Sequence, residues 1–577
     1  MKAGEKDSDH HVIFFLVDDV QGRLFFEKVL ADPNLMPHVR ADLLDRGATC
    51  ADVLSLFPSA SMQGHTTLLT GRYADGHEIL TGAFWDVNGE VPKRVNLASV
   101  GPGTIDAWNG RIACKTIFEF VPDSTSFHVV NRGAAVKFFR KRSLIKFALA
   151  YLRLKLKGMK YYLTATKFWE NLVLGNAKRW LKKLQGNSLT RLVQITFPPS
   201  DNAAHVHGMV DERGELTDGY KAALRLLDET YDVLVNGYVD RRGRRVPGLK
   251  QLGYYEKTLF VVASDHASRA YRHEFPLVDH IRRAWPFPVA NLYDERGRVV
   301  PPRGETPGDL ERARVLVGEE GGIAAFHVRD PATGRFPAWL PERALRNYPL
   351  EGGAEKVDVI QLVLDLPHVG HAHVRVAEDA FLVVSRGAVA RVTWRLEGNV
   401  SEFSYEISEG SDPLGYLNDG RVDQDLLDGQ FHDDRAWLRG TKEHAYPGVP
   451  EILARYFLCR FAAPVVAVAE DGWNFWIRPE EVEKRYQHDR DHRLETMVPL
   501  LLAGPGVRPG HVVDCCKNVD VVPTILHWLG VPFDPAEFDG KPLLEVFDGR
   551  ESGDERQLRR RTGIPSRSRA LSRPRPP

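Results

Sequence analysis

Aspartate and histidine residues follow apolar segments at four separate places in the chain. These residues are Asp18 and Asp19 after VIFFLV, Asp201 and His205 in FPPSDNAAHVHG, Asp265 and His266 after TLFVVAS, and His488 and His492 in YQHDRDHRLETMVPLLLAGPGV. Carboxylate and imidazole ligands together suit zinc or a similar divalent ion. Two such ions about 4 Å apart can hold the attacking and leaving oxygens of a phosphoryl transfer. One Asp-His pair would indicate only a hydrogen-bonded structural residue, but four clusters favour a metal centre.

Ser61 is the candidate nucleophile. It lies in FPSASMQGHTTLLTG, where a turn of small residues precedes a short apolar helix. The free amides and the positive dipole at the start of a helix favour a bound phosphate. Nearby metal ions would lower the pKa of the hydroxyl, so that no Ser-His-Asp triad is required. Considered alone, Ser61 would instead be expected to cap the helix.

The elements that position these residues alternate between short apolar strands and helical segments. VIFFLV, LVQITF and TLFVVA are typical of buried strands, and residues 220–240 form an amphipathic helical pattern. This alternation predicts an α/β fold with a mostly parallel central sheet and helices on both faces. Ligands of such sheets collect at the carboxyl ends of the strands, which is where the acids and histidines fall.

Changes in composition and hydrophobic pattern along the sequence divide the chain into four parts. We expect a first part of a catalytic core over 1–268 with a basic helical insertion at about 136–185, and an α+β cap insertion over 269–450. The core pattern resumes over 451–547 with PVVAVAE and MVPLLLAGPGV. Residues 548–577 are polar, basic and proline-rich, which predicts a disordered tail.

The overall composition favours no particular partner. Lys plus Arg equals Asp plus Glu at 77 each, and no specific nucleic-acid motif is present. The basic stretch 137–183 could contact an anionic membrane or polyanion weakly, but a solvated helix face explains it more simply. The five cysteines suggest no disulfide framework, and the start of the chain lacks the pattern of a secretory signal, so we expect a cytoplasmic protein.

The ordered segments resemble the motifs of the alkaline phosphatase superfamily, most closely the type I phosphodiesterase/nucleotide pyrophosphatase group. They are LVDD, FPSASMQGHTTLLTGRY, DNAAHVHG, VVASDHAS, MVPLLLAGPGV and VDVVPTILHWLG. The resemblance implies an alkaline phosphatase-like fold, a nucleophile at Ser61 and two divalent metal ions, most often zinc. It also implies the two ligand sets, which are Asp18, Asp265 and His266 for one ion and Asp201, His205 and a distal histidine for the other.

Several positions depart from the pattern of that group. The group usually has Gly in place of Asp19, whereas the sulfatase branch has an acid ligand there, so Asp19 is a candidate ligand or a neighbour of one. The family spacing selects His488 as the distal histidine, but Asp489 follows it in place of the usual Gly, and His492 competes.

Two further residues are candidates for phosphate binding. Gly64 occupies the place of an Asn that contacts phosphate in nucleotide pyrophosphatases, and Arg132 resembles the phosphate-contacting Arg of some phosphomonoesterases. His65 is expected to be structural. In PHVGHAH, the residues His371 and His373 share one face of a strand and could hold a metal with His368, although a structural or substrate-facing role is the simpler expectation.

The function predicted is hydrolysis of a small phosphate ester, with a phosphodiester favoured because few cations are available for the extra charge of a monoester. The alternatives are a phosphomonoesterase, a sulfatase-like hydrolase, or a catalytically degenerate metal- or ligand-binding protein. A sulfatase would need Pro and Arg where Gln63 and His65 stand. The missing Gly after His488 motivates the degenerate alternative.

Overall fold

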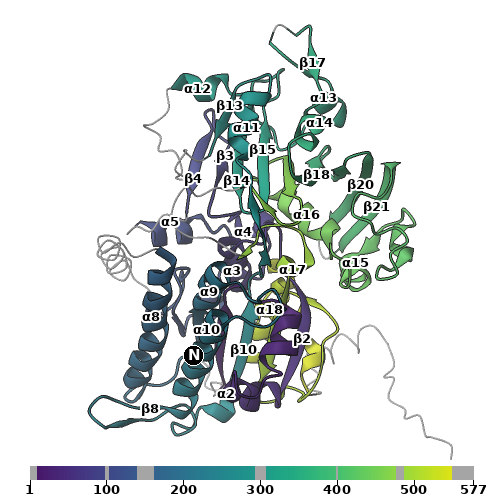
Figure 1. The fold of residues 1–577 in the computed structure, drawn as a ribbon. Coiled ribbons are helices and arrows are strands. Elements are labelled where there is room, and N and C mark those ends of the chain that lie inside the picture. The colour runs from purple at the N-terminus through teal and green to yellow at the C-terminus, as the bar shows by residue number, and fades with distance from the viewer. Residues whose placement is uncertain are drawn as a thin grey trace, which may run out of the picture.

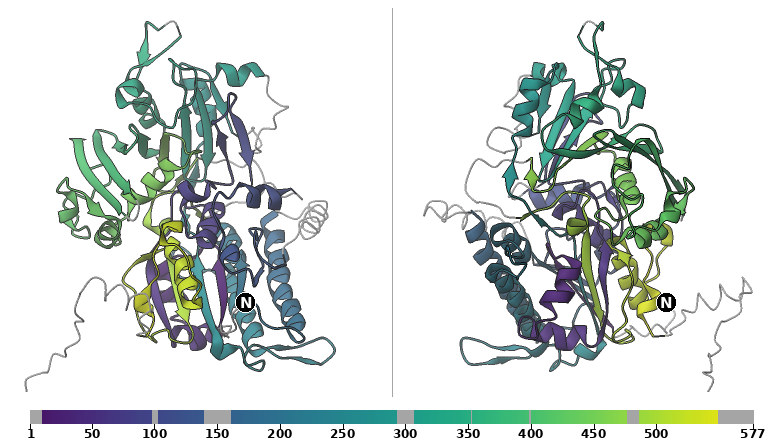
Figure 2. Two further views of the ribbon diagram at one scale, coloured as in Figure 1. Left: turned by 180° about the vertical axis from the view of Figure 1, so that it is seen from behind. Right: turned by 45° about the vertical axis from the view of Figure 1, so that its right-hand side comes forward.

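The computed structural model describes residues 10–97, 103–138, 161–292, 307–351, 353–397, 400–475 and 486–548. Within these ranges no helix has the length and the apolar character needed to cross a membrane. Figures 1 and 2 show two sheet regions stacked along the long axis of the molecule, with the chain start in the lower one.

The lower region contains an eight-stranded sheet with the order β27-β2-β26-β10-β1-β7-β5-β6. Its strands are β1 (His11–Val17), β2 (Gly47–Leu54), β5 (Ser124–Ser126), β6 (Val136–Lys137), β7 (Leu192–Phe197), β10 (Thr258–Ser264), β26 (Met497–Ala503) and β27 (Cys516–Lys517). Strand β26 is antiparallel to both β10 and β2, and the other neighbours pair in parallel. The predicted mostly parallel sheet is therefore confirmed.

Both faces of this sheet are covered because its central strands are apolar on both sides. In β1, Phe14 packs in a cluster with residues of α3 (Ser61–Thr70) and α18 (Val521–Leu529). Phe15, which points the other way, packs with residues of α8 (Tyr161–Leu184), α9 (Pro199–His207) and α10 (Asp218–Asn236). Successive side chains of a strand alternate between faces, so a continuous apolar run requires cover on both.

The register of the sheet brings the candidate site residues to one edge. Val17, the last residue of β1, pairs with Ser264 at the end of β10 and with Phe197 at the end of β7. The residues that follow these strands therefore emerge side by side. Because β26 runs antiparallel, the segment that precedes it reaches the same edge. Figure 1 shows α3, α9 and α17 (Arg493–Thr496) meeting in this region.

The upper region contains a nine-stranded sheet with the order β13-β14-β15-β23-β18-β19-β20-β21-β22. Its strands are β13 (Val289–Asn291), β14 (Val315–Glu320), β15 (Ile323–Val328), β18 (Val369–Arg375), β19 (Ala380–Ser385), β20 (Ala388–Glu397), β21 (Val400–Gly410), β22 (His432–Asp433) and β23 (Val465–Ala469). All pairs except β13-β14 are antiparallel.

The sequence-based boundary at residue 450 needs correction. Strand β23, which we expected in the second part of the core at 451–547, lies in the upper sheet between β15 and β18. Its sequence VVAVA is buried throughout and has no alternation of polar and apolar residues. Such a run fits the centre of either sheet, so only strand pairing decides between them.

The two sheets share one hydrophobic cluster. It includes Val261 and Leu502 of the lower sheet, and Val383 and Val466 of the upper one. Helix α16 (Val449–Leu458) lies between them, in contact with α4 (Ala74–His77) on one side and with β20 and β21 on the other.

The structure describes only part of the basic insertion. Residues 139–160 and 549–577 lie outside the described residues, so the predicted disordered tail and the predicted polyanion contact stay predictions. In the described part of α8, Trp180 and Leu181 are buried in the cluster that covers the lower sheet. This face of the helix packs against the core.

We expect Leu453→Ala in α16 to destabilise the whole protein. Leu453 is fully buried in the shared cluster, and a Leu→Ala change in a core costs about 2–5 kcal/mol. Urea unfolding followed by tryptophan fluorescence should show one transition at a lower midpoint. Val512→Ala is the control, since Val512 is 70% exposed. Two well-separated transitions in the unmodified protein would contradict the idea of one shared core.

Candidate metal centre

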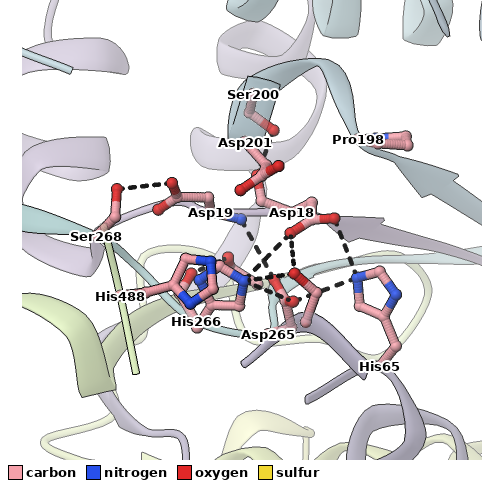
Figure 3. Close-up of polar contacts among 12 residues, drawn as sticks. Asp18, Asp19, His65, Pro198, Ser200, Asp201, Asp265, His266, Ser268 and His488 are labelled. Atoms are coloured by element: carbon pink, nitrogen blue, oxygen red, sulfur yellow. Dashed lines mark hydrogen bonds and ion pairs between the residues drawn. The ribbon is translucent and has the colours of Figure 1, made fainter. Parts of the chain in front are cut away.

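Ser61 lies beside residues that follow the ends of β1 and β10. The His266 Nε2 atom is 3.4 Å from Asp18 Oδ1 and 3.3 Å from Asp265 Oδ2 (Figure 3). The Ser61 Oγ atom is 2.9 Å from the same nitrogen and 3.5 Å from Asp18 Oδ1. The structure thus brings one predicted ligand set and the predicted nucleophile together.

The second predicted set lies beside the first. Asp201 and His205 are one turn apart on α9, with 3.1 Å between Asp201 Oδ1 and His205 Nε2. The ring of His488 lies 5.4 Å from that of His205 and 4.2 Å from that of His266. Ligand atoms of Asp201, His266 and His488 fall within 4.8 Å of one another.

A backbone carbonyl orients His205. The His205 Nδ1 atom is 2.7 Å from the carbonyl oxygen of Tyr486. Since a carbonyl can only accept, Nδ1 carries a proton, and Nε2 is the nitrogen that faces Asp201 and is available to a metal ion. This is the arrangement that second partners impose on metal-binding histidines.

His492 lies away from the cluster. Its Nδ1 accepts a hydrogen bond of 3.1 Å from the Leu494 amide and so caps α17. Burial lowers the pKa of His492 to about 3. Of the two competing histidines, the structure brings only His488 to the other site residues.

Asp489 and Asp19 adopt the backbone conformation that favours glycine. Their φ angles are 94° and 60°, which lie in the left-handed region that residues other than Gly rarely enter. These are the two positions where the resemblance predicts Gly. The backbone geometry is retained, and each aspartate adds a carboxylate that a glycine could not supply.

Each of these carboxylates has a polar partner. The His488 Nδ1 is 2.9 Å from Asp489 Oδ1, and the Asp489 amide donates to Ser59 Oγ at 2.8 Å. The Ser268 hydroxyl donates to Asp19 Oδ2 at 2.7 Å. Asp489 therefore orients His488, while the Asp19 carboxylate points toward Ser268 and the Asp19 amide donates to Asp265 Oδ1 at 3.3 Å (Figure 3).

A glycine turn of the upper sheet packs closely against the segment that carries His488. Gly321 and Gly322 connect β14 to β15. A Cβ atom on Gly321 would lie 2.0 Å from Asp489 Oδ2, and one on Gly322 would lie 2.2 Å from Arg490 Nε. The upper sheet therefore contributes to the position of His488, although it supplies none of the ligands predicted for the two ions.

The buried charges of the cluster interact strongly. Burial raises the pKa of Asp18, but the adjacent His65 and His266 outweigh burial and hold it well below its usual range. Burial lowers the pKa of His266, but Asp265 and the other acids outweigh it and raise that pKa. Burial raises the pKa of Asp19 well above its usual value.

His65 belongs to the site, which the sequence analysis missed. Its Nε2 is 3.3 Å from Asp18 Oδ2 and 3.2 Å from Asp265 Oδ2, and its Nδ1 is 2.9 Å from His128 Nε2. Burial lowers the pKa of His65, but Asp265 and Asp18 outweigh burial and raise it to about 10. The spacing from Ser61 could have placed His65 in the site, because residues four positions apart share one face of a helix and Ser61 lies four positions before His65.

Phosphate binding at Gly64 stays a prediction, and the structure gives this residue a packing role. Its amide donates to the carbonyl of Ala60 at 2.9 Å and is not free for a ligand. A Cβ atom on Gly64 would lie 2.7 Å from the Cβ of Asp265. The glycine instead allows α3 to approach the end of β10.

The structure gives no support to phosphate binding by Arg132, whose side chain has other partners. Its guanidinium contacts Glu119 at 3.0 Å and the carbonyls of Asn109 and Ile112 at 3.1 and 2.8 Å, and it also bonds to the carbonyl of Cys114. The Arg132 side chain therefore bonds to residues 109–119, which precede it in the chain.

Comparisons with known proteins identify the family and a similar fold. The family model described as type I phosphodiesterase / nucleotide pyrophosphatase matches residues 12–300, which is about half of the chain. A solved murine ectonucleotide pyrophosphatase / phosphodiesterase 5 is similar in fold, with a TM-score of 0.50 and 11% identity over 93% of this chain and 100% of that chain. A human ectonucleotide pyrophosphatase / phosphodiesterase 5 matches with a TM-score of 0.48 and 12% identity over the same shares.

The murine match extends the likeness in fold across both sheet regions, and the architecture is that of the alkaline phosphatase superfamily. The family match covers the segments that carry Asp18, Ser61, Asp201 and Asp265. The chain belongs to the type I phosphodiesterase/nucleotide pyrophosphatase family and is a phosphoric ester hydrolase.

Proposed function

We propose that this protein hydrolyses phosphodiesters with Ser61 as nucleophile and with two divalent metal ions, most favourably zinc. The observation that carries the proposal is the position of Ser61 Oγ, 2.9 Å from His266 Nε2 and beside the carboxylate of Asp18. A serine among buried acids and imidazoles is suited to attack on phosphorus and has no equivalent role in packing.

The residues of the cluster fit metal ions. Among the described residues, Asp19 Oδ1 is buried without a hydrogen-bond partner, while Asp201 Oδ1 and Asp265 Oδ2 have histidine nitrogens 3.1–3.3 Å away. Buried carboxylate oxygens are costly unless a cation or a donor meets them. Asp18, Asp265 and His266 would hold one ion, and Asp201, His205 and His488 the other. A mixed set of carboxylates and imidazoles favours zinc.

When bound, two such ions lower the pKa of the attacking hydroxyl and offset the charge of the phosphoryl oxygens. The residues of the chain position the reaction. Ser61 is the first residue of α3, and the first hydrogen bond of that helix is made by the Gly64 amide. The amides of Ser61, Met62 and Gln63 therefore face the start of the helix, where a phosphoryl oxygen can accept from them.

The reaction proceeds in two displacements. The Ser61 Oγ forms a bond to phosphorus while the bond to the leaving alcohol breaks. Water then cleaves the phosphoserine and regenerates the hydroxyl. His65, held between Asp18 and Asp265 one turn after Ser61, fixes the orientation of both carboxylates.

The charges around the site favour a diester over a monoester. A monoester dianion adds a negatively charged oxygen that needs a cationic or strongly donating partner. Arg132, the cation that the sequence offered for this oxygen, is bound to Glu119 and to backbone carbonyls. A diester carries one charge less and replaces that oxygen by an ester group.

Ser61→Ala should abolish turnover and leave the fold and metal content unchanged, because the hydroxyl supplies the nucleophile and little packing. We expect kcat to fall by about three orders of magnitude or more. Steady-state kinetics with elemental analysis measure both properties. Ser408→Ala, in β21, is the matched control and should remain active. Full activity of the Ser61 variant would mean that water attacks the substrate directly.

Asp489→Gly should weaken metal binding even though glycine suits the backbone at φ 94°. The change removes the acceptor of His488 Nδ1, and loss of such a partner costs about 10–100-fold in metal affinity. Asp489→Asn keeps an oxygen at this position and should bind metal nearly as well as the unmodified protein. Metal competition with a chromophoric chelator measures the affinities. Equal affinities for the Gly variant and the unmodified protein would remove Asp489 from this role.

We expect bis(4-nitrophenyl) phosphate to be hydrolysed with higher kcat/KM than 4-nitrophenyl phosphate, for the charge reason given above. The comparison uses the zinc-loaded enzyme. The diester assignment should be abandoned if the monoester is favoured by more than about tenfold, which corresponds to about 1.4 kcal/mol in transition-state binding.

A further inference from the structure

A second cluster of potential ligands lies between the upper sheet and the segment that carries His488. His371 and His373 are two positions apart on β18, so they point to the same face of the strand. Their Nε2 atoms are 2.9 and 2.8 Å from a single oxygen, Asp491 Oδ2. Asp491 follows His488 by three residues.

This cluster is enclosed by the protein. The side chains of His373 and Asp491 have no exposed surface, and that of His371 is 7% exposed. The ring of Tyr446 lies edge-on against His371 at 5.3 Å, and the ring of Phe57 packs against His373 at 6.0 Å. An ion placed here would be held away from bulk water.

Two arginines of the neighbouring segments pair with other acids. Arg490, the residue before Asp491, is paired with Glu495 at 2.9 Å, and Arg269 is paired with Asp471 at 2.8 Å. A fully buried carboxylate such as that of Asp491 is costly unless a cation or enough hydrogen-bond donors meet it.

Two polar atoms of the cluster could each form one further interaction. Asp491 Oδ1 and His373 Nδ1 are buried and have no hydrogen-bond partner among the described residues. A simple network, in which both imidazoles donate to Asp491 Oδ2, leaves Asp491 Oδ1 without a partner. Buried polar atoms without partners in a native structure call for an explanation, and a bound ion is one of the usual ones.

The donor set and its geometry suit a transition metal. Two imidazole nitrogens and one carboxylate oxygen are a common zinc set, with a fourth position for water. Zinc bonds of about 2.0–2.1 Å separate tetrahedral ligand atoms by roughly 3.3 Å. The present separations of 2.8 and 2.9 Å are close to the 3.1 Å between Asp201 and His205 in the main cluster, so small side-chain movements suffice.

We propose that His371, His373 and Asp491 bind a third divalent metal ion of the zinc class. The ion joins β18 of the upper sheet to the segment 488–491 and thereby fixes the position of His488. Its role is structural, since the cluster is closed to substrate, and it does not depend on the reaction at Ser61.

The test counts Zn²⁺ after dialysis in the double variant His371→Gln/His373→Gln. Glutamine side-chain amides can still donate to Asp491, so a hydrogen-bonded network survives while the metal site is lost. We expect one equivalent of Zn²⁺ less per chain than in the unmodified protein. His368→Gln, at the start of the same strand, is the matched control, because His368 stacks on Trp473 and is not part of the cluster. It should retain all metal.

A second measurement separates this site from the main cluster. In the background Asp18→Asn/Asp201→Asn/Asp265→Asn, about one equivalent of Zn²⁺ should remain, and adding Asp491→Asn should remove it. Replacing Zn²⁺ by Co²⁺ in this background should give the visible absorption of tetrahedral cobalt. Circular dichroism checks that each variant is folded.

Metal counts that are the same in the folded double variant and the unmodified protein would overturn the proposal, as would a background variant that is folded and binds no Zn²⁺. Both readouts are independent of turnover. Failure of Ser61 as the nucleophile would leave them unchanged, so the two proposals can fail separately.

Discussion

The concentration of buried negative charge at one edge of the lower sheet is the constraint on which the rest of the structure depends. Asp18, Asp19 and Asp265 have less than 6% exposure, and Asp201 lies beside them on α9. Four carboxylates at such short range repel one another and have lost most of their hydration, so they require positive or donating partners. The histidines that surround them, His65 included, meet this requirement and fix where a substrate can be placed.

Strand register, and not proximity in the sequence, brings these carboxylates together at one edge of the sheet. β1, β7 and β10 end level with one another, and the reversed direction of β26 brings His488 to the same edge from the other side. The helix that carries Ser61 must come close to β10, which only Gly64 allows, since a Cβ atom would meet Asp265 at 2.7 Å. The same positions in a slightly different register would separate the nucleophile from the ligands.

The upper sheet is part of this arrangement and not merely a cover. Its glycine turn at 321–322 packs on Asp489 and Arg490, and its strand β18 contacts Asp491 through two histidines. His488 is therefore held by three consecutive residues, each of which contacts the upper sheet or the turn before α3. A shared hydrophobic cluster makes the two regions one packing unit, which is consistent with the likeness in fold across 93% of the chain.

The sequence by itself determined the class of fold, the main strands, the position of Ser61 before a helix and the order of the acid and histidine segments. These features depend on local periodicity and on residue type, which a single chain displays directly. Tertiary structure alone placed His488 and not His492 beside the other ligands, put β23 in the upper sheet, paired Arg132 with Glu119, and brought Asp491 to His371 and His373. Each of these outcomes depends on which distant strand or polar group becomes the partner of a residue. A sequence pattern does not contain that information, because a buried apolar strand fits more than one neighbour, and a histidine or arginine can be satisfied by any suitable partner that the fold brings within reach.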